Sequence, residues 1–167
     1  MREGGRNLLT PIRIRPATSA DVATLNRFQH GVVAAERPFD PTIQEGPVQY
    51  YDVADMLASD QVLFLVAESD TMLIGCGFAR IEPAKAHLKH PLRGYLGMMF
   101  VDPEYRGQSV NARLIDSLKA WCLSNNVGEL RLEVYHDNAA AVRAYEKAGF
   151  RKLMVEMRLD LNDESSN

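Results

Sequence analysis

Three nearly continuous apolar runs follow one another in the middle of the chain, and they restrict the fold more than any other feature. They are residues 61–68, 73–81 and 94–102. Runs of this length without polar alternation are typical of strands that are covered on both faces. Gly97 inside the third run predicts a bulge or a close approach of another backbone. We therefore expect a central sheet that is buried on both sides.

The segments around these runs alternate between helical and extended patterns. An apolar stripe with helical spacing begins at Val110, and an Ala-rich helix over residues 139–148 ends before Gly149, which suits a left-handed position. The further expected strands are residues 12–15, 130–134 and 153–161, and the further expected helices are residues 22–32 and 48–58. This order predicts a mixed α/β fold.

Composition narrows the class of protein. A length of 167 residues predicts a single domain over residues 1–161, and the polar residues 162–167 predict a disordered tail. A formal net charge of −3 argues against a nucleic acid as the partner. Since the chain has neither an apolar leader nor 18 consecutive apolar residues, we expect a soluble cytoplasmic protein that does not bind a membrane. Cys76 and Cys122 lack metal-ligand spacing, and we expect buried free thiols and no metal site.

The junction from Val101 to Ala112 carries the strongest signal for a binding site. A strand ends there, the chain turns, and a helix begins. The first N–H groups of a helix and the positive end of its dipole suit a phosphate group. An ordinary strand-to-helix turn has the same pattern, so this segment alone leaves both interpretations open.

Two motifs in this half of the chain resemble one known family. Val101, Pro103, Arg106 and Gly107 lie in a run similar to the acetyl-CoA-binding signature of the GCN5-related N-acetyltransferase (GNAT) superfamily, Gln/Arg-x-x-Gly-x-Gly/Ala. The strand 132–134 and the segment 138–150, with Asn138, Tyr145 and Gly149 at the family's spacing, resemble its later strand and helix. The resemblance covers roughly residues 64–159, and its second motif resembles the branch of the family that acetylates protein N termini, including the ribosomal-protein alanine acetyltransferases.

The resemblance implies a mixed, mostly antiparallel central sheet of about six to seven strands. About four helices would flank it, and the sheet would splay in the middle to take acetyl-CoA as a cosubstrate without a metal. Backbone groups from Met99 to Val101 would hold the pantetheine and the acetyl carbonyl. The expected cosubstrate-binding residues are Met99, Phe100, Val101, Arg106, Gly107, Gln108, Ser109, Val110, Asn111, Ala112 and Asn138.

The signature departs from the family at both of its glycine positions, which are Ser109 and Asn111 here. Glycine at such positions permits unusual dihedral angles and a close approach of the backbone to pyrophosphate. Asn tolerates the left-handed conformation, and the side chains of Ser and Asn can both donate hydrogen bonds to phosphate. We therefore expect cosubstrate binding in an altered geometry.

The resemblance assigns catalytic roles to two residues that also have plain structural interpretations. Tyr145 would be the general acid for the coenzyme A thiolate, although a tyrosine on such a helix is by default a core residue. Glu133 would be the general base, although it could equally be a solvated strand carboxylate. Asn138 could cap the following helix, contact the cosubstrate, or do both. His87, His90 and His136 are weaker candidates for the base.

The acceptor is left open by the sequence. One region of the chain corresponds to the part of the family's fold that usually lines the acceptor site, although a solvated loop would have the same composition. Its residues are Glu36, Asp40, Glu45, Tyr50 and Tyr51. A small-molecule amine and a peptide or protein N terminus both fit the predicted chemistry. A non-catalytic acyl-CoA-binding module and an enzyme for longer acyl-CoA are the alternatives. The resemblance also leaves a homodimer open, with residues 153–161 as an edge for pairing.

Overall fold

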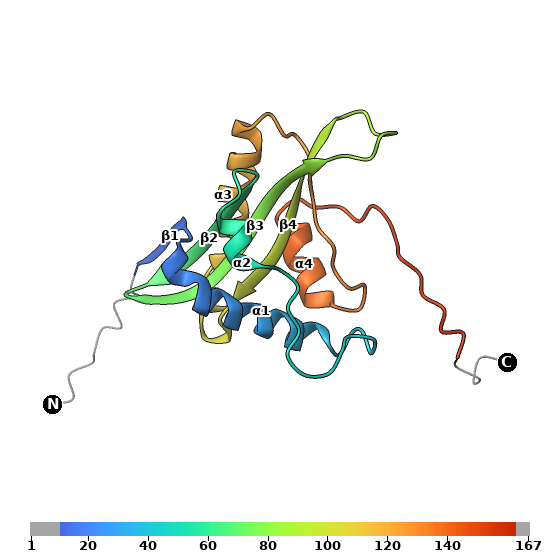
Figure 1. The fold of residues 1–167 in the computed structure, drawn as a ribbon, viewed down its shortest axis with the longest axis horizontal. Coiled ribbons are helices and arrows are strands. Elements are labelled where there is room, and N and C mark those ends of the chain that lie inside the picture. The colour runs from blue at the N-terminus through green and yellow to red at the C-terminus, as the bar shows by residue number, and fades with distance from the viewer. Residues whose placement is uncertain (1–10, 163–167) are drawn as a thin grey trace. The chain divides into compact units, whose positions relative to one another are not determined.

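The structure, a computed structural model, describes residues 11–162 (Figure 1). It divides into two compact units, one ending at Glu133 and one beginning at Val134. Each unit is described here by itself. In the described part of the chain, no helix is both long and apolar enough to cross a membrane.

The first unit contains a five-stranded sheet in the order β1-β2-β3-β4-β5. The strands are β1 (Ile12–Pro16), β2 (Val62–Ser69), β3 (Met72–Pro83), β4 (Leu92–Val101) and β5 (Leu130–Arg131). The first four strands pair antiparallel, whereas β5 pairs parallel with β4. The chain passes through a helix between β4 and β5, as a parallel connection requires. The predicted mixed, mostly antiparallel sheet is confirmed.

Three α-helices accompany this sheet: α1 (Val22–Glu36), α2 (Val53–Leu57) and α3 (Val110–Ser124). Figure 1 shows α1 and α2 on the near side of the sheet and α3 behind it. A short 3-10 turn, Ser19–Asp21, leads into α1, and Thr18 and Asp21 form a capping box there. Asp21 also accepts hydrogen bonds from the Arg15 guanidinium at 2.8 and 3.1 Å, which ties the start of the helix to β1.

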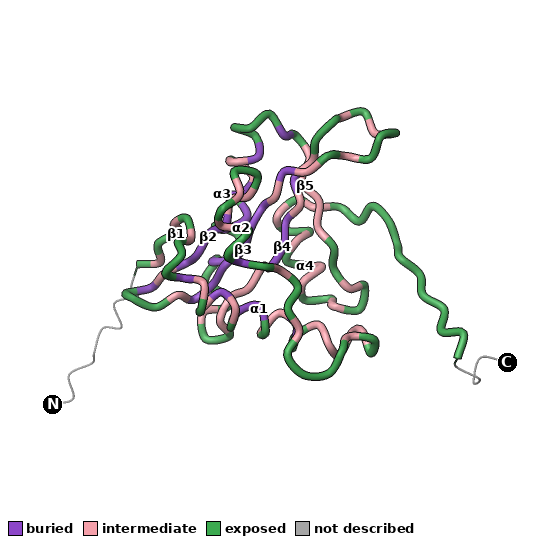
Figure 2. Tube along the Cα trace, viewed as in Figure 1, coloured by how far each residue is buried: buried purple, intermediate pink, exposed green. Residues whose placement is uncertain are grey.

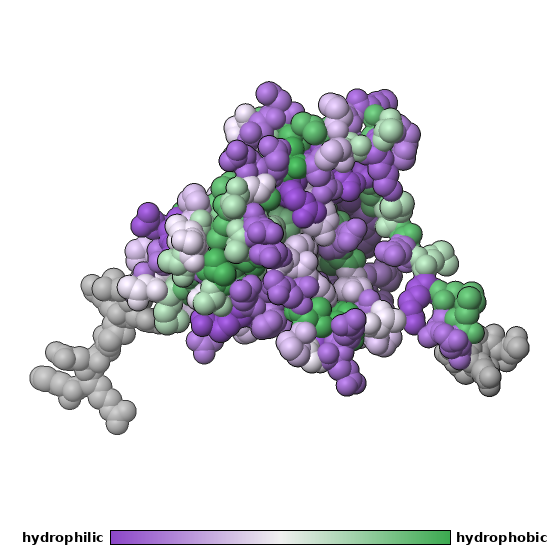
Figure 3. Space-filling model, in the orientation of Figure 1, coloured by the Kyte–Doolittle hydropathy of each residue, from purple (hydrophilic) through white to green (hydrophobic). Residues whose placement is uncertain are grey.

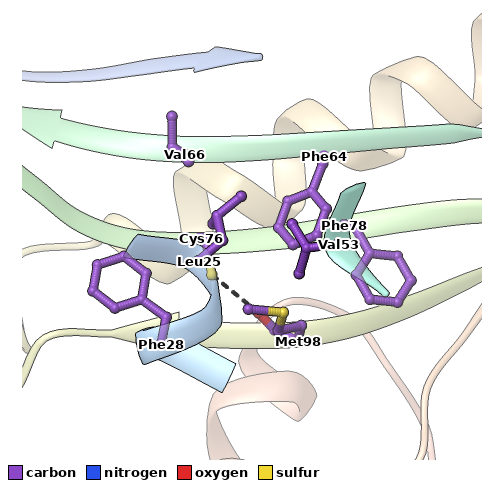
Figure 4. Packing of buried hydrophobic residues seen from close by; sticks show 8 residues of the cluster. All are labelled: Leu25, Phe28, Val53, Phe64, Val66, Cys76, Phe78 and Met98. Atoms are coloured by element: carbon purple, nitrogen blue, oxygen red, sulfur yellow. Dashed lines mark hydrogen bonds between the residues drawn. The ribbon is translucent and has the colours of Figure 1, made fainter. Parts of the chain in front are cut away.

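The core covers both faces of the sheet, since buried positions follow β2, β3 and β4 and both α1 and α3 have buried faces (Figure 2). Its main cluster consists of Leu25, Phe28, Val53, Phe64, Val66, Cys76, Phe78 and Met98 (Figure 4). The Phe28 ring stacks on Phe100 at 4.6 Å between centroids, so α1 is packed directly on β4. The expected free thiols are confirmed, and burial raises the pKa of both Cys76 and Cys122.

The second unit holds one helix, α4 (Ala139–Lys147). The Asn138 side chain accepts a hydrogen bond from the Ala141 N–H at 3.2 Å, which caps the helix. The helix ends at Lys147, and Gly149 just after it has a φ of +98°, the left-handed conformation that the sequence predicts. Tyr145 packs edge-on against Phe150 at 5.9 Å.

The expected strand at residues 153–161 does not form in the described structure, so the sheet has five strands rather than six to seven. Residues 151–160 belong to no strand, and Figures 2 and 3 show an exposed segment that carries hydrophobic side chains. The large apolar residues that are at least 73% exposed are Leu153, Met154, Val155, Met157, Leu159 and Leu161. Alternating polarity selects the faces of a strand, but a strand also needs a neighbouring edge for its hydrogen bonds.

Two other expected elements are shorter than predicted. The strand expected over residues 130–134 is paired only at Leu130–Arg131. The helix expected over residues 48–58 spans only Val53–Leu57, where Asp52 caps the first turn by accepting from the Asp55 N–H at 3.1 Å. The residues before Asp52 are held in a non-helical path by a buried side chain of α1, as described below. Of the expected tail, residues 163–167 lie outside the described residues.

Candidate active site

The sheet of the first unit opens between β4 and β5. These two strands pair only at Gly94 with Leu130 and at Tyr95 with Arg131. Beyond that point, β4 pairs with β3 alone within the described chain, so the other backbone edge of residues 96–101 has no strand partner. The predicted segment Met99–Val101 therefore lies on an open edge, where its N–H and C=O groups can take a ligand.

A bulge in β4 lies at the same place. Cys76 is opposite Phe100 and Phe78 is opposite Gly97, so β4 has one residue more than β3 between these pairs. The extra residue is accommodated at Met98, which has a φ of +49°. Bulges re-aim side chains and end strand pairing, and they are frequent beside active sites. The bulge is thus a local reason for the opening of the sheet.

The predicted phosphate turn follows directly after β4. A 3-10 turn, Pro103–Tyr105, is capped by Asp102, whose carboxylate accepts from the Glu104 N–H at 3.0 Å. The chain then takes a left-handed conformation twice, at Gly107 with φ +78° and at Ser109 with φ +61°. Asn111, which the sequence made a candidate for that conformation, lies instead in the first turn of α3.

The start of α3 offers the donors that a phosphate group needs. The first intrahelical bond runs from the Arg113 N–H to the Ser109 carbonyl at 3.1 Å. The preceding N–H groups of Val110, Asn111 and Ala112 therefore lack an intrahelical acceptor. A Cβ atom added at Gly107 would meet no atom within 4 Å, and Arg106 and Gln108 are exposed next to it. The turn thus combines free donors, a cation and room for an anionic ligand.

A polar cluster borders the opening on the side of α1 and α2. Tyr51 and Tyr95 share a hydrogen bond between their hydroxyl groups, and the Arg80 guanidinium lies 5.3 Å from the centre of the Tyr95 ring. The carboxylate of Glu133 is exposed and close enough to influence both hydroxyl groups. Burial raises the pKa of both tyrosines, so both remain proton donors at neutral pH. We call Tyr51, Tyr95, Arg80 and Glu133 the tyrosine cluster.

Tyr95 was missed by the sequence analysis. It lies inside the apolar run of residues 94–102, where nothing distinguishes it from an ordinary buried strand residue. Its partner Tyr51 is 44 positions earlier in the chain, so no local pattern pairs them. The signal that could have found Tyr95 is a polar hydroxyl in an apolar strand, because a buried hydroxyl needs a hydrogen-bond partner.

The predicted acceptor wall is brought together in part. The Tyr50 hydroxyl donates to the Glu36 carboxylate at 2.9 Å, and burial raises the pKa of Glu36. Asp40 lies near Glu36 and accepts from the Thr42 N–H at 2.8 Å. Glu45 is exposed in the same loop. Glu36, Tyr50 and Tyr51 therefore form one connected wall, whereas Asp40 and Glu45 belong to the loop outside it.

The remaining predicted residues are Asn138, Tyr145, His87, His90 and His136. Asn138 and Tyr145 belong to the second unit, where Asn138 acts as the helix cap, and their contact with a cosubstrate stays a prediction. Among the histidines, His90 lies 3.3 Å from the Glu129 carboxylate in the hairpin between β3 and β4, and His87 and His136 are exposed.

Two known proteins with similar sequences are both named as N-alpha-acetyltransferases. N-alpha-acetyltransferase 30 of Saccharomyces cerevisiae is 32% identical over 90 residues, which cover 54% of this chain and 49% of the relative. An N-alpha-acetyltransferase of Sulfurisphaera tokodaii is 31% identical over 111 residues, covering 64% of this chain and 66% of the relative. The chain thus spans less than two thirds of the length of either relative.

A solved structure shows the same fold. A predicted acetyltransferase from Clostridium acetobutylicum, whose crystal structure contains acetyl-CoA, superposes with a TM-score of 0.69 at 18% identity, covering 90% of this chain and 97% of that one. The model of the acetyltransferase (GNAT) family matches residues 31–150. That range runs from the last turns of α1 through β4 and α3 to the end of α4, so the chain belongs to the acetyltransferase (GNAT) family.

Proposed function

We propose that this protein is an acetyl-CoA-dependent N-acetyltransferase that transfers the acetyl group directly to an amine. The observation that carries the proposal is the open backbone edge at Met99–Val101, which leads without interruption into the phosphate turn and the free N–H groups of α3. A ligand with a thioester at one end and a pyrophosphate at the other fits this succession of donors. Acetyl-CoA supplies the activated acyl group, and the chain supplies its binding and the proton transfers.

The open edge of β4 and the turn before α3 support the following binding roles. Backbone groups of residues 99–101 would hold the pantetheine arm and polarise the acetyl carbonyl, because preorganised N–H donors stabilise the charge that develops on that oxygen. The N–H groups of residues 107–112 would bind the pyrophosphate, with Arg106 as the nearby cation. The Asn138 side chain is proposed to contact the cosubstrate while it caps α4.

The proton transfers require a base and an acid. The acceptor nitrogen forms a bond to the acetyl carbon while the bond from that carbon to sulfur breaks. Glu133 is proposed to accept the proton that the nitrogen loses, directly or through a water molecule, and Tyr145 is proposed to donate a proton to the sulfur. Tyr51 and Tyr95 remain protonated and are proposed to orient the amine beside Glu133, since they cannot act as bases at neutral pH.

We propose a peptide or protein N terminus as the acceptor. The names of the yeast and archaeal relatives support this class over polyamines, amino sugars and antibiotics. The carboxylates of Glu36 and Glu133, which both act on the Tyr51 hydroxyl, also suit a cationic amine before it loses its proton.

A non-catalytic acyl-CoA-binding module is the second candidate, and the two substituted glycine positions favour it. The first test is thermal unfolding with and without acetyl-CoA. Ligand at a hundred times its dissociation constant stabilises by about 2.7 kcal/mol, which corresponds to roughly 5 to 10 °C in a domain of this size. The absence of any shift at millimolar acetyl-CoA would refute both candidates.

Turnover separates the enzyme from the module. We expect coenzyme A release with peptides that carry a free N terminus, and its loss in Tyr145→Phe with acetyl-CoA binding retained. Binding without turnover of any peptide or small amine would instead establish the module. Competition by propionyl-CoA and succinyl-CoA tests the use of a longer acyl group.

A homodimer formed through residues 153–161 is part of the same proposal. Its support is an extended segment with unpaired backbone and exposed apolar side chains, which is a template for pairing with a second copy. Light scattering should find a dimer that Met157→Lys converts to a monomer, whereas a monomeric wild-type protein would rule the dimer out.

A further inference from the structure

The side chain of Gln29 is fully buried in the middle of α1, with 0% of its surface exposed. Its Oε1 accepts from the Tyr50 N–H at 2.8 Å and from the Tyr51 N–H at 2.6 Å. Its Nε2 donates to the Tyr51 carbonyl at 3.3 Å. All three hydrogen bonds of this one amide thus go to the backbone of two consecutive residues.

The hydrogen bonds to Gln29 hold residues 50–51 in a non-helical conformation, where the sequence predicts a helix. The sequence predicts a helix from residue 48, yet the helix begins only at Val53. Before it, the N–H groups of Tyr50 and Tyr51 have no helical acceptor, and the amide of Gln29 accepts from both. A buried backbone N–H without a partner costs free energy, so the segment keeps this path only while Gln29 holds it.

The two residues held in this way carry the acceptor side of the site. The Tyr51 ring packs edge-on against Phe78 at 5.0 Å, and its hydroxyl bonds to Tyr95 in the tyrosine cluster. The Tyr50 hydroxyl bonds to Glu36 at 2.9 Å. A shift of this backbone would therefore move the side chains of Tyr50 and Tyr51 together.

We infer that Gln29 is a positioning residue for the acceptor site, which acts through Tyr50 and Tyr51 and selects how the amine substrate is bound. The inference rests on the proposed function, because it assigns the wall of residues 50–51 to the acceptor. Gln29 does not itself reach the reacting atoms, since it is fully buried. Its loss should therefore change acceptor binding and leave acetyl-CoA binding as it is.

The test compares two substitutions at this position. Gln29→Leu is close in size and removes all three hydrogen bonds, whereas Gln29→Glu keeps an oxygen acceptor for both N–H groups. We expect Gln29→Leu to raise the KM for a peptide acceptor at least tenfold, with the Kd for acetyl-CoA within twofold of wild type. Gln29→Glu should recover part of the loss.

A control separates positioning from general loss of stability. Leu118 is fully buried in α3, behind the sheet, and Leu118→Ala also destabilises the core. We expect this variant to lower the melting temperature without the selective rise in acceptor KM. An equal rise in KM for Leu118→Ala, or an unchanged KM for Gln29→Leu, would overturn the inference.

Hydrogen exchange provides a readout that does not depend on turnover. The Tyr50 and Tyr51 amides should be protected in the wild-type protein and exchange faster in Gln29→Leu, with other amides of α1 still protected. If the wild-type protein shows no turnover, the proposed function fails and the exchange data still decide whether Gln29 holds the segment. Unprotected Tyr50 and Tyr51 amides in the wild-type protein would refute its positioning role.

Discussion

The ring of Phe78 in β3 lies against the backbone of Gly97 in β4, so close that a Cβ atom added to Gly97 would stand 2.5 Å from the ring carbon Cζ. The same Cβ atom would lie 3.2 Å from the Tyr51 hydroxyl. Glycine is needed here because the core ring and the tyrosine cluster both use the space that a side chain would fill. The contact also lies next to the bulge that opens the sheet.

We predict that Gly97→Ala destabilises the protein and weakens acceptor binding. Overpacking a core of this kind costs about 1–3 kcal/mol, because Phe78 is fully buried and has little room to move. Chemical denaturation measures the loss. Gly128→Ala is the matched control, since its Cβ meets no atom within 4 Å, and it should change stability by less than about 0.5 kcal/mol. Equal effects of the two substitutions would contradict the packing argument.

Ser109→Gly should stabilise the protein and tighten acetyl-CoA binding. A left-handed residue with a Cβ atom costs roughly 1–2 kcal/mol relative to glycine, and Ser109 has a φ of +61° at the position where the family signature has glycine. Thermal unfolding and calorimetry with acetyl-CoA measure the two effects. Gly107→Ala, at φ +78° in open space, should show the opposite sign. A less stable Ser109→Gly variant would mean that the serine hydroxyl contributes more than the strain.

Acid should weaken the fold through Asp21. The hydrogen bond from Arg15 lowers the pKa of the Asp21 carboxyl below its ordinary value, so the ionised form stabilises the folded state above about pH 4. This contribution is lost as the pH falls through the lowered pKa. Asp21→Asn should therefore cost about 1–3 kcal/mol at pH 7 and make stability less dependent on pH below about 4. Asp160→Asn, in an exposed ion pair, is the control that should do neither.

Glu133→Gln should lower turnover most at low pH. If the carboxylate accepts the proton of the amine, its loss matters where the amine is protonated and matters less where the solution already deprotonates it. We expect a loss on the order of 100-fold at pH 7 that shrinks above pH 9. Glu129→Gln, a neighbouring carboxylate paired with Arg131, should leave the profile unchanged. A loss that is the same at every pH would remove Glu133 as the base.

Local patterns predicted most of the fold. The three apolar runs became β2, β3 and β4, and the stripe from Val110 became the buried face of α3. These predictions succeed because side-chain periodicity within a strand or helix reports directly which face is buried. The phosphate turn was predicted from the same kind of local signal, a strand that ends next to a helix start.

The strand predicted at residues 153–161 shows the limit of such patterns. Its alternation is regular, yet its apolar side chains are exposed and it pairs with no described strand. Periodicity can be recognised within one segment, whereas a strand forms only when a second strand is available for its backbone hydrogen bonds. The same limit explains why the expected helix from residue 48 is short, because a buried amide from another helix accepts its N–H groups.

The sequence by itself therefore determined the order of the elements from β1 to α4, the buried faces, the left-handed Gly149 and the turn between β4 and α3, all of which depend on residues within a few positions of one another. Only the tertiary structure decided the bulge at Met98, the pairing of Tyr51 with Tyr95 and the hydrogen bonds from the backbone of residues 50–51 to Gln29. The physical reason is sequence distance. Gln29 and Tyr51 are 22 positions apart, and a hydrogen bond between them exists only because α1 and the segment before α2 are packed on the same sheet.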